Sequence, residues 1–250
     1  LNQYDETMNL LVPNYKGGTS YEYFAADPSS ASNAAIRNLM SRVEPSQQQQ
    51  VNQQLYIATK HYWGEQPFTS GPVYMGAVLL FLFALGAFVT QNRLKWWILT
   101  SFLLCLIMAW GKNLAFFNYF LVDTVPMLNK FRSVTMILGI ANILAIILAA
   151  MGLHEIAKKG LPQSQKLKGL YLAAGITGGL SILAWLMAQM NLLDFASIAE
   201  QQGIGQQFPD LLAAMKSDRA DILAKDALRS FALIGVAAGI LWAFITKKIK

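Results

Sequence analysis

Long uncharged apolar stretches alternate with polar segments along this chain. The uncharged stretches cover approximately residues 73–91, 96–111, 134–153, 169–193 and 231–246. A membrane-spanning helix needs ~20 apolar residues to cross about 30 Å of hydrocarbon, and backbone in lipid must satisfy its own hydrogen bonds. The pattern therefore predicts an all-α protein, a polytopic transmembrane helix bundle with about five spans.

The polar segments separate two regions, 1–72 and 73–250. We expect residues 1–72 to form an extracytoplasmic segment containing short helices, one after Ser32 that ends before Pro45 and another over about 48–62. Within the membrane region, 112–133 and 194–230 are predicted outer loops. Pro209 favours a helix start, and the charged helix that follows is expected to run into the fifth span.

Composition supports a lipid environment and argues against a nucleic-acid-binding domain. The chain has 250 residues, of which 54% are hydrophobic and 14% charged, whereas a typical soluble domain has roughly a quarter charged residues. The net charge of +6 is not gathered on a soluble face, so we expect no nucleic-acid partner. We expect membrane lipid to be the main partner.

The short loops carry the charge asymmetry that orients membrane proteins. Residues 92–95, 154–168 and 247–250 hold many lysines and arginines, with Glu155 as their one acidic residue. Because basic loops stay in the cytoplasm, these segments are predicted to be cytoplasmic. The chain is then a multi-pass protein of a cell membrane, with its N-terminal segment outside and its C-terminus in the cytoplasm.

An aromatic and polar segment precedes the first span. Tyr62, Trp63 and Glu65 combine flat apolar rings with a carboxylate, a combination suited to binding a sugar or a sugar acceptor. The alternative is an interfacial aromatic belt before a Gly-Pro helix start. His61 and Glu65 lie four residues apart, but two groups fall short of a metal site, and no cofactor site is identified.

Two cations stand at the outer entrance of the third span. Arg132 and Lys130 are predicted to bind a lipid phosphate, because guanidinium and ammonium groups donate to phosphate oxygens. The alternative is a pair that extends to ordinary headgroups or to Asp123. In the spans, Asn142 is expected to bond to a neighbouring helix, and Gly235 with Gly239 favours close helix–helix association.

Four segments resemble the bacterial YfhO family of polytopic membrane proteins. They are ETMNLLVPN at 6–14, the segment 62–76, PMLNKFRSVTM at 126–136 and DALRS at 226–230. The resemblance implies a GT-C-like glycosyltransferase that transfers a sugar from a polyprenyl-phosphate donor to a cell-envelope acceptor. It also implies that this chain is a fragment, with the catalytic acid in a first outer loop upstream of Leu1.

Under that resemblance the cationic pair would face the donor phosphate, and the aromatic segment would border the sugar or acceptor. A divalent metal on the leaving phosphate stays open as an alternative to cationic side chains. Two other functions also stay open: a transporter or flippase-like subunit, and a non-catalytic scaffold. Transport ranks lower because the span midplanes carry no charge that would couple it.

Overall fold

A computed structural model shows a protein whose described regular structure is helical, apart from an isolated bridge between Tyr23 and Lys60. The structure describes residues 4–64, 69, 71, 73–124, 136–158 and 160–248. The all-α prediction is confirmed for these residues. Lys130, Arg132 and Glu65 lie outside them.

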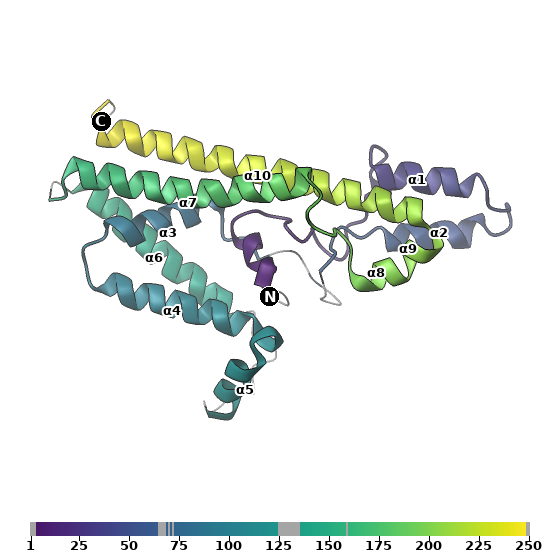
Figure 1. Ribbon diagram of the computed structural model, residues 1–250, viewed down its shortest axis with the longest axis horizontal. Helices are drawn as coiled ribbons and strands as arrows, with labels where there is room; N and C mark the ends of the chain where they lie inside the picture. The colour runs from purple at the N-terminus through teal and green to yellow at the C-terminus, as the bar shows by residue number, and fades with distance from the viewer. Residues whose placement is uncertain are drawn as a thin grey trace. The chain divides into compact units, whose positions relative to one another are not determined.

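The chain divides into two compact units. Unit 1 comprises Leu1–Val12, Val73–Ile182 and Leu228–Lys250, and unit 2 comprises Pro13–Pro72 and Leu183–Ala227. Two long helices supply residues to both: α7 (Gln163–Gln189) and α10 (Pro209–Ile245). The prediction that the charged helix continues into the fifth apolar stretch is confirmed, because α10 is a single helix (Figure 1).

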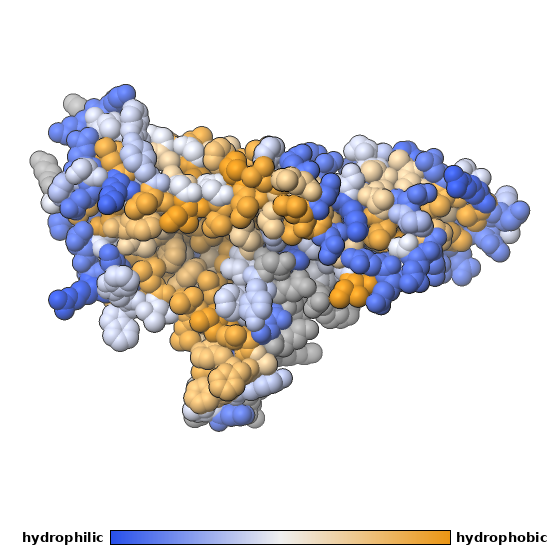
Figure 2. All heavy atoms as spheres, viewed as in Figure 1, coloured by the Kyte–Doolittle hydropathy of each residue, from blue (hydrophilic) through white to orange (hydrophobic). Residues whose placement is uncertain are grey.

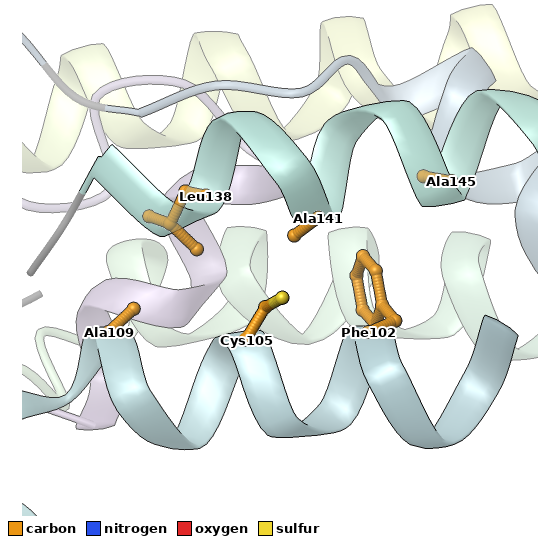
Figure 3. Close-up of a cluster of buried hydrophobic side chains, with 6 residues drawn as sticks. All are labelled: Phe102, Cys105, Ala109, Leu138, Ala141 and Ala145. Atoms are coloured by element: carbon orange, nitrogen blue, oxygen red, sulfur yellow. The ribbon is translucent and has the colours of Figure 1, made fainter. Parts of the chain in front are cut away.

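In unit 1, α6 (Ile137–Ala157) packs against both α3 (Ala77–Val89) and α4 (Leu94–Ala109). Figure 3 shows the α4–α6 contact, where side chains from the two helices point toward one another. Its buried members are Phe102, Cys105, Ala109, Leu138, Ala141 and Ala145. Small residues here let the two helices approach closely, as is usual between helices in membranes.

Glycines set the other close approaches in unit 1. A Cβ on Gly169 of α7 would lie 2.5 Å from Cγ1 of Val89, and one on Gly178 would lie 3.5 Å from the ring of Phe231 on α10. By contrast, a Cβ on Gly235 or Gly239 would meet nothing within 4 Å. No described part of this chain packs on that pair, so its role in association stays a prediction.

The N-terminal residues of unit 1 contact the ends of α3 and α4 and the middle of α10. The 3-10 helix η1 (Tyr4–Leu10) places Thr7 to accept a 2.9 Å hydrogen bond from Nε1 of Trp110, just after α4. The backbone N–H of Met75, before α3, donates to the Leu10 carbonyl at 3.2 Å. The Ser230 hydroxyl of α10 donates to the Leu11 carbonyl at 3.2 Å.

Three helices are long and apolar enough to cross a membrane: α6, α7 and α10. Their outward faces are apolar; Ile143 is 59% exposed on α6, Ile176 is 49% exposed on α7 and Val236 is 62% exposed on α10. Figure 2 shows hydrophobic side chains gathered over α7 and the C-terminal part of α10. Such extended apolar faces require a nonpolar surrounding, which supports membrane localisation.

Two of the predicted spans are shorter helices. The 13 residues of α3 extend roughly 20 Å and the 16 of α4 roughly 24 Å at 1.5 Å per residue, less than the roughly 30 Å of hydrocarbon. After α4, the 3-10 helix η3 (Gly111–Leu114) leads into α5 (Ala115–Thr124), where Phe116, Tyr119 and Phe120 are exposed.

The side-chain hydrogen bonding of Asn142 differs from the prediction. Its Oδ1 atom is buried on α6 and has no hydrogen-bond partner among the residues that the structure describes. The expected bond from this oxygen to a neighbouring helix is therefore absent there. The buried residues at the contact between α4 and α6 are apolar apart from the thiol of Cys105, which is a weak donor.

Unit 2 contains α1 (Ala31–Met40), α2 (Gln48–Ala58), the short helices η2 (Phe24–Ala26), α8 (Ile198–Gln202) and α9 (Ile204–Gln207), and the start of α10. One cluster of its buried side chains consists of Ala25, Ile36, Leu55, Leu211 and Met215. The first helix begins earlier than predicted, because Ser30 rather than Ser32 is its N-cap. The second ends at Ala58, before the predicted Tyr62.

Candidate functional site

Unit 2 has a pocket of about 580 Å³ between residues of its N-terminal and C-terminal parts. This volume is in the range of sites for small molecules. Its polar lining residues are Ser20, Gln54, Lys60, Tyr62, Ser197 and Glu200, and isoleucines at 57, 198 and 204 also line it. The pocket therefore offers hydroxyl, amide, ammonium and carboxylate groups beside apolar side chains.

The carboxylate of Glu200 is held in a fixed position. Ser197 caps α8, with its hydroxyl accepting from the Glu200 N–H at 3.2 Å. In return, Glu200 Oε2 accepts from the Ser197 N–H at 2.8 Å, which completes a capping box. This reciprocal pair satisfies two backbone donors at the helix start.

Arg219 of α10 binds the same carboxylate through two parallel bonds. Its Nη2 donates to Oε1 at 2.7 Å and its Nη1 donates to Oε2 at 3.0 Å. The Arg219 side chain is fully buried and that of Glu200 is 15% exposed. Such a bidentate pair fixes the carboxylate plane as well as its position.

The remaining contacts of Arg219 are backbone carbonyls. Nη1 donates to the Phe195 carbonyl at 2.8 Å and Nη2 donates to the Lys60 carbonyl at 2.7 Å. Its Nε is buried without a partner among the described residues. Arg219 thus connects α10 by hydrogen bonds to the segments that contain Lys60 and Glu200. Removing its side chain would leave Glu200 without this counter-charge.

The backbone at Phe195, which accepts a hydrogen bond from Arg219, adopts a strained conformation. Its φ of 49° lies in the left-handed region, which a bulky side chain adopts only when the surroundings hold it there. The ring is buried and packs against Trp63, with 5.6 Å between ring centroids. This packing and the bond from Arg219 hold the conformation in place.

The sequence-predicted aromatic residues have different surroundings. Tyr62 lines the pocket. Trp63 is 6% exposed, and Lys16 Nζ lies 3.8 Å from its ring centroid, so the indole is engaged inside unit 2. The sugar-binding roles of both residues, and of Glu65, stay predictions.

The ring of His61 packs on the ring of Phe24. The two rings stack with centroids 4.0 Å apart, and Nδ1 of His61 lies 3.6 Å from Oε2 of Glu22. Burial lowers the pKa of His61 below its ordinary value of 6.5, while the Glu22 carboxylate partly opposes this by raising it. Across the described part of the chain, no group of three or more possible metal ligands comes together.

Sequence reasoning missed Lys60, Ser197, Glu200 and Arg219. One signal was available: Ser197 followed three residues later by Glu200 has the capping-box spacing. Nothing in the sequence indicated that Arg219 would reach Glu200, because the two residues come from different helices. The proposed phosphate-binding residues, Lys130 and Arg132, lie outside the described residues and are not placed.

Two of the segments that carry the family resemblance meet in unit 2. Nδ2 of Asn14 donates to Oδ2 of Asp226 at 2.8 Å. In comparisons with known proteins, no family model, no curated protein and no solved structure matches this chain. The site must therefore be interpreted from its own geometry.

Proposed function

We propose that this chain is part of an integral membrane glycosyltransferase of the GT-C-like type, similar to the YfhO family. It would transfer a sugar from a polyprenyl-phosphate donor to a cell-envelope acceptor. The observation that carries the proposal is the pocket of unit 2, which is lined by Tyr62, Ser197 and Glu200. Hydroxyl and carboxylate groups of this kind can form hydrogen bonds with sugar hydroxyls.

The proposal includes five membrane crossings. Besides the three long apolar helices, α3 and α4 would cross together with the apolar residues that flank them. The interfacial tryptophans fit this arrangement, since Trp96 and Trp97 are 63% and 74% exposed at one end of α4. Tryptophan rings favour the boundary between lipid and water.

The arrangement of the polar segments supports the proposed orientation. Unit 2 combines Pro13–Pro72 with Leu183–Ala227, which include most of two segments that the loop charges assign to the extracytoplasmic side. Their packing into one compact unit is what we expect if both polar segments lie on the same side of the membrane. Likewise, residues 4–12 contact Met75 and Trp110 beside the ends of α3 and α4, and Ser230 within α10. The same scheme would place all three positions at the outer boundary of the membrane.

Transfer from a lipid phosphate requires a base near the acceptor hydroxyl and positive charge near the leaving phosphate. In the proposal, Arg132 and Lys130 supply the positive charge. Tyr62, Trp63 and Glu65 would border the sugar or acceptor, with Tyr62 at the pocket itself. The base is not assigned to any residue of this chain.

The test is a transfer assay with the intact protein in proteoliposomes, supplied with a labelled polyprenyl-phosphate sugar and an envelope extract. We expect labelled product, and we expect Arg132→Ala to abolish it while expression is unchanged. The matched control is Arg42→Ala, which replaces an exposed arginine just after α1. Movement of the labelled lipid across the bilayer without product would instead indicate a transporter.

A further inference from the structure

We propose that the pocket of unit 2 recognises a sugar that carries a negative charge. Lys60 is the residue that selects the charge, Glu200 is an acceptor for a sugar hydroxyl, and Arg219 is a positioning residue for Glu200. This inference deepens the proposed function by assigning residues and a ligand class to the same pocket.

The charge balance of the pocket favours an anion. Its described lining includes one basic residue, Lys60, and one acidic residue, Glu200. The charge of Glu200 is already compensated by Arg219, whereas no described acidic side chain forms an ion pair with Lys60. The Lys60 ammonium is therefore the uncompensated charge, and a phosphate or similar group would be its natural partner.

Glu200 retains capacity to accept another hydrogen bond. Its Oε2 accepts from the Ser197 N–H and from Arg219, while Oε1, among the residues that the structure describes, accepts from Arg219 alone. A carboxylate has about four acceptor sites, so Oε1 can accept from a ligand hydroxyl. Its exposed fraction lines the pocket, which places that capacity where a sugar would bind.

Arg219 acts through Glu200, because its own side chain is fully buried and does not line the pocket. Its two parallel bonds hold the carboxylate plane, and its bonds to the Lys60 and Phe195 carbonyls hold two lining segments together. A lysine at 219 would keep the positive charge but lose the bidentate geometry. The ligand would then meet a carboxylate free to rotate.

The apolar side of the pocket distinguishes two sources of such a ligand. Ile57 is 46% exposed and Ile198 is 66% exposed. These side chains suit either the C–H faces of a free sugar phosphate or the first isoprene units of a lipid-linked sugar phosphate. Both ligands share the anionic sugar on which the proposal rests.

The test is calorimetric titration of the full chain in detergent micelles with glucose 1-phosphate, glucose and inorganic phosphate, each alone. We expect glucose 1-phosphate to bind about tenfold or more tightly than glucose, since a charge-assisted bond contributes that much. Lys60→Gln should abolish this preference. Lys225→Gln, an exposed lysine of the same unit, should retain it.

Variants at the carboxylate give a different signature. Glu200→Gln and Arg219→Lys should each lower the affinities for glucose and for glucose 1-phosphate by the same factor, about tenfold. The ratio of the two affinities should therefore stay unchanged. Glu44→Gln, an exposed glutamate of unit 2, is the control. If Arg219→Lys fails to fold, Glu200→Gln alone carries the test.

Equal binding of glucose and glucose 1-phosphate would overturn the inference. So would a Lys60→Gln protein that behaves like Lys225→Gln. Glucose linked through phosphate to a short isoprenoid separates the two sources: tighter binding than glucose 1-phosphate supports the lipid-linked form, and equal binding supports the free form. If glucose 1-phosphate binds in a way that depends on Lys60 but no sugar transfer occurs in proteoliposomes, the proposed function is overturned and this inference stands.

Discussion

Gly86 of α3 and Gly152 of α6 meet backbone to backbone. A Cβ on Gly152 would lie 2.6 Å from the Cα of Gly86, and a Cβ on Gly86 would lie 2.2 Å from the carbonyl oxygen of Leu148. Real Cβ atoms do not approach backbone so closely, so the two helices must separate to admit a side chain. The contact between α3 and α6 therefore depends on these glycines.

We expect Gly86→Ala or Gly152→Ala to lower the stability of unit 1 by about 1–3 kcal/mol, the usual cost of overpacking. Thermal unfolding of the purified protein in detergent measures it. Gly139→Ala on α6 is the matched control, because its Cβ would meet nothing within 4 Å. Equal unfolding temperatures for all three variants would show that α3 and α6 are not packed in this way.

Asp218 of α10 caps the start of α1. Its Oδ1 accepts from the Ala31 N–H at 2.9 Å, and its Oδ2 accepts from the Ser32 N–H at 2.8 Å and from the Ser32 hydroxyl at 2.6 Å. Asp218→Ala should destabilise unit 2 by about 1–3 kcal/mol, because it leaves these donors without their charged acceptor. Limited proteolysis within 31–40 is the readout, and the exposed Asp221→Ala should leave the cleavage rate unchanged.

The unpartnered Oδ1 of Asn142 predicts a stabilising substitution. Replacing the amide with the similar-sized leucine removes a buried polar atom that has no described partner, so Asn142→Leu should stabilise the protein by about 1–3 kcal/mol. An increased unfolding temperature in detergent would agree. A decrease would show that the amide has a partner in the intact membrane protein, as the sequence suggested.

The lowered pKa of His61 predicts a pH dependence of stability. Because burial disfavours the charged imidazole, the unfolded chain takes up a proton more readily than the folded one below about pH 6.5. Stability should therefore be greatest above that pH and fall as the pH is lowered from about 7 to about 5. Unfolding curves of His61→Gln should show a smaller fall in stability over this pH range than those of the unsubstituted protein.

The orientation is tested by labelling engineered cysteines in whole cells with an impermeant maleimide. In a Cys105→Ala background, Tyr21→Cys should react, because this position is 67% exposed in unit 2, and Lys158→Cys after α6 should be protected. Labelling after cell lysis controls for reactivity. The reverse pattern would contradict the extracytoplasmic assignment of unit 2.

The sequence by itself determined the helical class and the approximate positions of the apolar helices. Uncharged runs and the 3.6-residue repeat are local properties, so they can be recognised without knowing what packs against them. Tyr62, which lines the pocket of unit 2, was selected from a local aromatic and polar cluster in the sequence, and its role in sugar binding stays a prediction. The helix that starts at Pro209 and runs into the last apolar stretch was also predicted from local signals.

Only the tertiary structure decided which distant residues form the site. Arg219 and Glu200 lie on different helices, and Lys60 joins them from a third segment through its carbonyl. The same holds for Asp218 with Ser32 and for Gly86 with Gly152. Such pairings depend on how the helices pack, and a single sequence records each side chain without recording its neighbours in space.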